Sequence, residues 1–207
     1  WKTKEGLVRG CACRGTAGFS HVSCLAEQAK ILFAEAEENN LGVEAANTRW
    51  RRWDTCSLCE QDYHGVVCCA LGWACWKTYV GRPEMDNARC FAINVLGDGL
   101  FVANHCEDAL TVREAELSME RRRGASEEHI LAVQGNLAAT YQKLRRFEET
   151  SQMLRDVYSG HLRLHGEENI QTISNANNYA VSLNGLQRFE EAKALLRKMI
   201  PVARRVL

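Results

Sequence analysis

The sequence predicts a mainly α-helical protein in which a small zinc-stabilised module precedes a solenoid of helix-turn-helix repeats. Three observations lead to this prediction. Cysteine and histidine residues cluster in metal-ligand spacing near the start of the chain, a 42-residue period runs through its second half, and apolar residues recur with helical spacing. We expect the zinc module over residues 1–65, an apolar connecting helix over 66–83 and about three repeats over 84–207.

The composition limits the class of protein. The chain has 207 residues, 46% hydrophobic and 25% charged, which suits one large or two small soluble domains. Its 26 Lys and Arg balance its 26 Asp and Glu, so no strong field for nucleic acid or an anionic membrane is expected. The longest apolar run, residues 65–76, is shorter than the roughly 20 residues that cross a bilayer. We therefore expect no nucleic-acid and no membrane partner.

Six candidate metal ligands follow the spacing C-x-C-x7-H-x2-C-x31-C-x2-C: Cys11, Cys13, His21, Cys24, Cys56 and Cys59. Thiolates and imidazoles this close in sequence can point at one zinc ion, about 2.3 Å and 2.1 Å away. Closing four ligands around the ion contributes ~10 kcal/mol of folding free energy. A disulfide framework would break this pattern, so we expect zinc as the cofactor and a reducing, cytoplasmic compartment.

The order of these ligands, with the segment CACRGTAGFSHVSCL and the later Trp53, resembles the last three quarters of a RING-CH zinc finger. In that family eight C4HC3 ligands hold two zinc ions in a cross-brace. The resemblance implies a RING-like module in which Cys11, Cys13, Cys56 and Cys59 form one complete site. It also implies that His21 and Cys24 share the other site with a C-x2-C pair that residues 1–10 lack. We expect that the missing pair lies upstream in a longer protein, with a naturally degenerate finger as the alternative.

Other residues near the finger have several interpretations. His64 is a candidate substitute ligand, although a histidine with no metal role is commoner. The three cysteines of the apolar run are expected to be small buried residues: Cys68, Cys69 and Cys75. Gln28 stands where the RING-CH family often has a tryptophan that helps to dock a ubiquitin-conjugating enzyme, which weakens the expectation of docking. Residues 25–38 form an amphipathic helix that Asn39, Asn40 and Gly42 should end.

The second half of the chain repeats itself. The segment from Asn136 to Leu154 returns 42 residues later from Asn178 to Leu196, and a weaker earlier copy includes Asn94. A fixed period of this size indicates stacked repeats, here about three, near 84–125, 126–167 and 168–207. Each copy contains two amphipathic helices joined by a turn. Gly124 and Gly166 should close the second helices, where a residue with positive φ is needed.

The segments LAATYQKLRRFEET and NYAVSLNGLQRFEEAKALL resemble tetratricopeptide repeats of the kinesin-light-chain type. The resemblance implies an α-solenoid whose concave face, lined by the first helix of each pair, binds protein or peptide ligands. It further implies that an asparagine of each first helix holds the peptide backbone. Asn94, Asn136 and Asn178 match that position; hydrogen bonding between repeats is the alternative role for these residues.

Two functional hypotheses follow. In the first, the chain is a RING-CH-like ubiquitin ligase or a fragment of one, whose finger recruits a ubiquitin-conjugating enzyme while the repeats recruit a protein substrate. In the alternative, it is a non-enzymatic peptide-binding adaptor with a degenerate structural zinc finger. No catalytic constellation appears, so any enzymatic role would be that of a scaffold. A third hypothesis, that the tryptophans and arginines of residues 49–53 bind nucleic acid, is disfavoured by the zero net charge.

Overall fold

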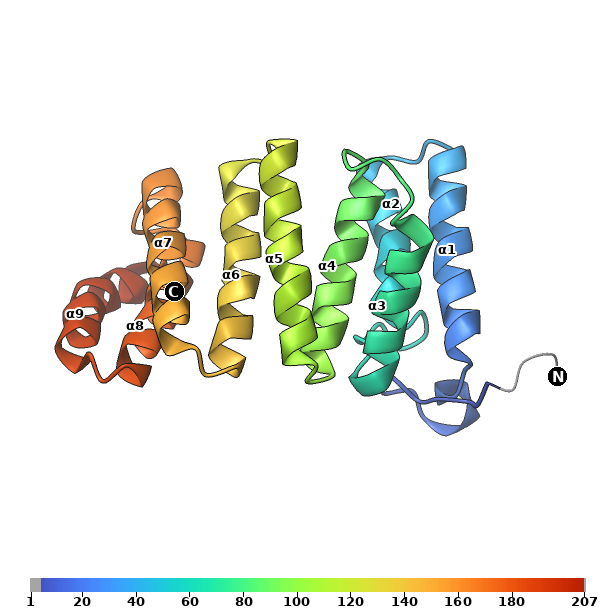
Figure 1. The fold of residues 1–207 in the computed structure, drawn as a ribbon, viewed down its shortest axis with the longest axis horizontal. Helices are drawn as coiled ribbons and strands as arrows, with labels where there is room; N and C mark the ends of the chain where they lie inside the picture. Colours follow the sequence, from blue (N-terminus) through green and yellow to red (C-terminus); the bar gives the residue numbers. More distant parts are fainter. Residues whose placement is uncertain (1–4, 207) are drawn as a thin grey trace. The chain divides into compact units, whose positions relative to one another are not determined.

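The computed structural model describes residues 5–206 and divides into two compact units, Trp1–Val112 and Arg113–Leu207. The predicted mainly α-helical fold is confirmed (Figure 1). Among the described residues, β pairing is limited to two isolated antiparallel bridges, Val8 with Ser20 and Thr55 with Asp62. The residues expected at the ends of the predicted domains, 1–4 and 207, lie outside the described part of the chain.

The first unit combines a cysteine-rich segment with a group of helices. Its elements are η1 (Gly15–Gly18), α1 (Val22–Glu38), α2 (Val43–Trp50), η2 (Arg51–Trp53), α3 (Gly65–Tyr79), α4 (Asn87–Val102) and the start of α5 (Cys106–Arg123). The expected end of the first helix is confirmed, because Asn39 caps α1 and Asn40 has a φ of 48°. The predicted boundaries at residues 65 and 83 both fall inside this unit.

Helices α3 and α4 pack at unusually close range through glycines. A Cβ on Gly72 would lie 3.0 Å from the Leu96 Cα, and a Cβ on Gly99 would lie 2.8 Å from the Cys68 carbonyl oxygen. Since only glycine leaves this space open, the apolar run of α3 can lie directly against α4. Leu71 and Cys75 of α3 are fully buried. The other two cysteines of this run are half-buried.

An aromatic cluster joins α1, α2 and η2 to the end of α3. The Trp50 ring lies edge-on to Phe33, with ring centroids 4.8 Å apart, and 5.1 Å from Tyr79. Trp53 is only 1% exposed and packs 6.0 Å from the Tyr79 ring. Because Trp50 and Trp53 are both buried in the core, neither offers a free face on which a nucleobase could stack. Both side chains pack in the core of this unit.

The second unit contains, besides residues 113–123 of α5, the helices α6 (Glu127–Lys143), α7 (Phe147–His165), α8 (Ile170–Gly185) and α9 (Phe189–Val206). From α6 to α9, each helix packs against the next. Two of these helices begin at side-chain caps: the Ser126 hydroxyl accepts from the His129 N–H, and the Asn169 carboxamide accepts from the Gln171 N–H. Gly124 and Gly166 have φ values of 69° and 77°, which confirms their predicted conformation.

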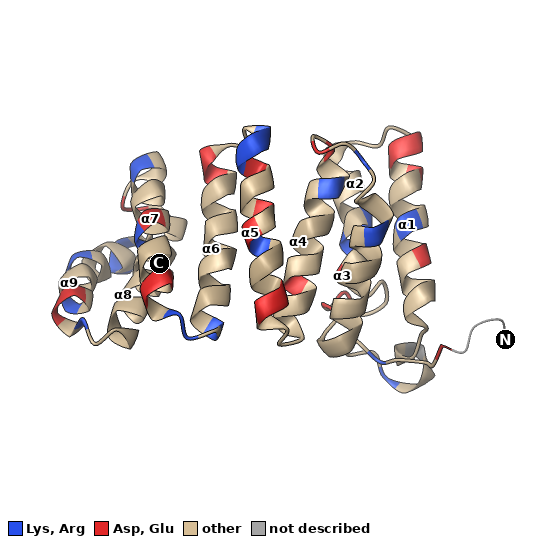
Figure 2. Cartoon of the chain, in the orientation of Figure 1, with Lys and Arg blue, Asp and Glu red and all other residues tan. Residues whose placement is uncertain are grey.

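Most helices carry charged residues of both signs, but α8 has none and α6 bears its charges at its two ends (Figure 2). The ion pair between Arg113 and Glu116 in α5 is buried: the guanidinium donates to the carboxylate at 2.7 Å. No helix of the described residues has the length and apolar character to span a membrane.

Candidate functional sites

Four of the six predicted zinc ligands lie together in the first unit. The Sγ atoms of Cys11, Cys13, Cys56 and Cys59 all lie within 4.8 Å of one another, and those of Cys13 and Cys56 are 3.7 Å apart. A tetrahedral site with zinc–sulfur bonds of about 2.3 Å has sulfur–sulfur separations of about 3.8 Å. The donor set, its geometry and its burial therefore fit a four-thiolate structural zinc site.

Backbone hydrogen bonds hold the two halves of this cysteine quartet. The Cys56 N–H donates to the Gln61 carbonyl at 2.9 Å, which closes the loop that carries the second cysteine pair. Within that loop the Leu58 N–H lies 3.4 Å from the Cys56 sulfur. The first pair is tied in by the His64 N–H, which donates to the Gly10 carbonyl at 2.9 Å. Segments more than forty residues apart in sequence thus meet at the quartet.

The quartet is electrostatically unsuited to four free thiolates. A backbone hydrogen bond at Gln61 lowers the pKa of Cys59 to about 7. The pKa of Cys13 is raised in the opposite direction, to about 12, chiefly by its hydrogen bond with Cys59 and then by desolvation. Crowded sulfur atoms resist a second and third negative charge. A divalent cation at the centre reverses this preference, because it stabilises every thiolate that it contacts.

The other predicted ligands do not join the quartet. His21 is the N-cap residue of α1, and its Nδ1 lies 3.8 Å from the sulfur of the exposed Cys24. Within residues 5–206, no third histidine, cysteine or carboxylate completes a cluster with this pair. The His64 side chain is exposed and lies outside the quartet. The structure therefore brings together the four donors of one zinc site. The pair of His21 and Cys24 supplies only two of the four ligands that a second zinc site would need.

A shallow depression lies beside the quartet. Its volume is about 290 Å³, and its lining includes Phe19, Leu25, Gln28 and Leu58. Phe19 is 48% exposed and Leu58 is 69% exposed, so two large apolar side chains border this surface. Gln28, on α1, occupies part of the lining where an aromatic residue would add apolar area.

The second unit contains a larger cleft of about 440 Å³ between α6, α7 and α8. Its lining residues recur at helical spacing on each of the three helices: Glu128, Leu131, Ala132, Gly135, Asn136, Leu154, Val157, His161, Gln171, Ser174, Asn175 and Asn178. The floor is apolar because Leu131, Leu154 and Val157 are buried. The walls are polar and are dominated by carboxamides. We refer to this feature as the carboxamide cleft.

Two of the three predicted peptide-binding asparagines line this cleft. Asn136 on α6 and Asn178 on α8 are both exposed, and neither side-chain amide forms a hydrogen bond with another described residue. This arrangement does not support the alternative role of hydrogen bonding between repeats for either of them. Asn94 lies on α4 in the first unit, is half-buried and has an interaction partner within the chain, so its role stays a prediction.

His161 and Gly135 are among the cleft residues that sequence reasoning missed. His161 on α7 is only 7% exposed, and its Nδ1 lacks a hydrogen-bond partner. Burial lowers its pKa, the nearby His165 lowers it further, and Glu128 partly opposes the shift. Gly135 on α6 faces open space, since a Cβ there would meet no atom within 4 Å. The spacing of Leu154, Val157 and His161 along one helical face is the signal that identifies the histidine as a lining residue.

The paired helices, their repeated turns and the cleft on the first helices define the chain's second half as part of an α-solenoid repeat protein. A family model described as Tetratricopeptide repeat matches residues 129–205. These residues contain α7 and α8 and nearly all of α6 and α9, and so almost the whole carboxamide cleft. The match does not extend to the cysteine quartet. No curated protein matches the sequence.

Solved structures resemble the chain in fold. BtubC (BKLC) from P. vanneervenii superposes with a TM-score of 0.63 at 14% identity, covering 90% of this chain and 73% of that one. Nearly identical TPR-like repeats from Podosopora anserina, described as kinesin light chain, give a TM-score of 0.60 at 16% identity, covering 91% of this chain and 79% of that one. At these identities the likeness shows the fold alone.

Proposed function

We propose that this chain is a non-enzymatic adaptor that binds an extended peptide segment of another protein in the carboxamide cleft. The observation that carries the proposal is the pair Asn136 and Asn178. They stand 42 residues apart in sequence, line one cleft and leave both side-chain amides free. The match of residues 129–205 to tetratricopeptide repeats supports a protein-binding role for this surface.

The chemistry of the cleft suits a peptide backbone. Each asparagine offers one acceptor and two donors, which complement the C=O and N–H groups that an extended chain presents at regular intervals. Two such contacts fix the position and direction of the bound segment. The apolar floor beneath them can take one side chain of the ligand, and burial of that side chain supplies the favourable free energy that polar contacts alone do not.

The test starts from random dodecapeptides displayed on phage and selected on the purified chain. For selected peptides, we expect Asn136→Ala and Asn178→Ala each to weaken binding about three- to tenfold, which corresponds to one lost hydrogen bond. Asn177→Ala is the matched control, because Asn177 is exposed on α8 but does not line the cleft. Equal affinities for all three variants, measured by fluorescence anisotropy, would contradict the proposal.

In this proposal the cysteine quartet binds one zinc ion with a structural role. The metal supplies cross-links between Cys11, Cys13, Cys56 and Cys59, which lie in two segments more than forty residues apart in sequence. All four positions around the ion are taken by thiolates, so no position remains at which a substrate would bind.

A second candidate function is that of a RING-CH-like ubiquitin ligase, and one observation favours it. The depression beside the quartet carries the exposed side chains of Phe19 and Leu58, which would suit an apolar loop of a ubiquitin-conjugating enzyme. The test is discharge of ubiquitin from a panel of charged conjugating enzymes. Acceleration that is lost in Leu58→Ala and kept in Leu7→Ala, an exposed leucine outside the depression, would support this function over the adaptor.

A further inference from the structure

The charge in the lining of the carboxamide cleft is negative. Of the described residues that line it, Glu128 is the one carboxylate, and none is a lysine or an arginine. Helix α8 contains no charged residue at all, and the charges of α6 are confined to its ends (Figure 2). A peptide lying in this cleft therefore meets one negative charge and no positive side chain.

The helix N-termini near Glu128 do not form a binding site for an anion. Both α6 and α8 begin there in the stack, and a free helix N-terminus would attract a carboxylate. However, the Ser126 hydroxyl already accepts from the first turn of α6, and the Asn169 carboxamide accepts from two N–H groups of α8. The first turn of α6 also carries Glu127 and Glu128. These acidic side chains oppose the approach of a second anion.

Two histidines lie near the Glu128 carboxylate or in the lining of the cleft. His165 Nε2 lies 3.5 Å from the Glu128 carboxylate and is a charge partner only when protonated. His161 is buried beside the floor, and its lowered pKa favours the neutral imidazole. The Glu128 side chain is 70% exposed, so its carboxylate is accessible to a ligand.

We propose that the cleft selects basic peptides: an extended segment that places an apolar side chain over Leu131, Leu154 and Val157 and a lysine or arginine side chain against Glu128. This inference rests on the proposed peptide-binding function and adds the class of ligand. Acidic segments are disfavoured, because their carboxylates would be desolvated beside Glu128 with no cation to pair with.

The experiment uses two pools of random dodecapeptides with blocked termini, on arrays probed with the purified full chain at about pH 8, where histidine side chains are neutral. One pool contains Lys and Arg but no Asp or Glu; the other contains Asp and Glu but no Lys or Arg. We expect the bound peptides to come from the basic pool. Glu128→Gln should weaken their binding about threefold, the effect of one exposed ion pair, and added salt should reduce that difference.

Two variants make the result specific. Glu127→Gln is the matched control for charge in the first turn of α6, since Glu127 pairs with Arg163 and does not line the cleft. Gly135→Leu fills the cleft at a position where a Cβ meets no neighbour, and leucine favours the helix, so the fold is retained. Loss of binding in Gly135→Leu identifies the cleft as the site for whichever pool binds.

The outcomes separate the two proposals. Basic peptides that bind less well to Glu128→Gln than to Glu127→Gln would establish the inference. Two results would overturn the charge preference and leave the cleft as the peptide site. In one, acidic peptides bind and Gly135→Leu abolishes their binding; in the other, basic peptides bind Glu128→Gln as well as the unaltered chain. If peptides of either pool bind Gly135→Leu as well as the unaltered chain, or none bind, the proposed function fails and the inference fails with it.

Discussion

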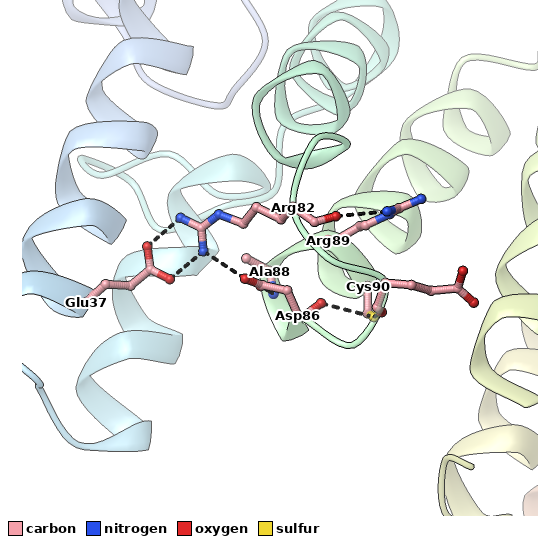
Figure 3. A network of polar contacts seen from close by, with 7 residues as sticks. Glu37, Arg82, Asp86, Ala88, Arg89 and Cys90 are labelled. Atoms are coloured by element: carbon pink, nitrogen blue, oxygen red, sulfur yellow. Dashed lines mark hydrogen bonds and ion pairs between the residues drawn. The ribbon is translucent and has the colours of Figure 1, made fainter. Parts of the chain in front are cut away.

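Arg82 and Glu37 form a two-point ion pair in the first unit. The two terminal nitrogens of Arg82 donate to the two carboxylate oxygens of Glu37 at 2.6 and 2.7 Å, and one of them also lies 3.4 Å from Asp86 (Figure 3). The guanidinium lies 5.0 Å from the centre of the Tyr79 ring. The pair connects the last turn of α1 with the loop between α3 and α4. The Arg89 guanidinium also contacts this loop, because it donates to the Arg82 carbonyl.

We predict that Arg82→Ala lowers the free energy of unfolding of the first unit by about 1 kcal/mol or less, because both side chains are about one third exposed, 31% and 39%. Arg82→Lys keeps the charge but loses the planar fork, so it should recover only part of the loss. Tryptophan fluorescence during urea unfolding isolates this unit, since all five tryptophans precede residue 113. Lys30→Ala, at a more exposed single contact, serves as the control; an equal loss there would count against the prediction.

The cysteine quartet should hold one zinc ion per chain. Elemental analysis of protein purified without added metal should give one equivalent, and Cys56→Ser should lose it, because three thiolates bind zinc more weakly than four. Cys24→Ser should keep the metal, since Cys24 lies outside the quartet. Retention of zinc in Cys56→Ser together with its loss in Cys24→Ser would place the ion at the His21 pair.

Two helical glycines should respond to alanine with opposite signs. Gly99→Ala should destabilise the first unit by about 1–3 kcal/mol, because its Cβ would meet the backbone of Cys68 at 2.8 Å and force α3 and α4 apart. Gly135→Ala meets no neighbour and should stabilise the second unit by up to about 1 kcal/mol through helix propensity. Thermal unfolding followed by circular dichroism measures both. Loss of stability in Gly135→Ala would show that the open space above it is filled in solution.

Acidification should destabilise the second unit through His161. Its folded-state pKa lies below the ordinary value of about 6.5, because it is buried and faces His165, with only Glu128 opposing the shift. Below about pH 6.5 the unfolded chain therefore binds more protons than the folded chain, and stability falls as the pH falls. This loss is absent at higher pH, where both states are neutral at this site.

We expect His161→Leu to flatten the pH dependence of the unfolding transition between about pH 7 and 5, because it removes the group that titrates. Urea unfolding followed by circular dichroism measures this, and the change should not appear in the tryptophan signal, which reports the first unit. An unchanged pH slope in the variant would assign the acid sensitivity to another group.

The solenoid was predictable because periodicity is a property of sequence. Residues equivalent to Asn136, Phe147 and Gly124 recur at a fixed interval, which predicts repeated helix pairs, and the structure contains these helix pairs. The contact between α3 and α4 was not predictable in the same way. Gly72 lies inside the predicted apolar helix and Gly99 inside the first predicted repeat, and the pattern gives neither a special role. Both let two backbones approach closely, which produces no periodic signal in the sequence.

The two candidate sites also differ in how far the sequence predicts them. The four quartet cysteines come as two short-range pairs, so their spacing identified them among six candidate ligands, and the resemblance to RING-CH fingers implied that these four share one site. The structure brings the four together. The carboxamide cleft needs residues from three helices, and sequence reasoning identified only the asparagines that recur with the repeat. His161 and Gly135 belong to a single copy, so a comparison of one repeat with the next gives them no weight.

The turn between the two helices of a pair requires a left-handed backbone conformation, and several residue types adopt it. Asn104, Arg145 and Gln187 each follow the first helix of a pair, with φ values of 65°, 61° and 60°. Three chemically different side chains thus occupy equivalent left-handed turns, at a modest conformational cost for each. The spacing of these turns also varies: Arg145 follows Asn104 by 41 residues, and Gln187 follows Arg145 by 42. The same left-handed turn therefore recurs although the sequence between successive turns differs by one residue.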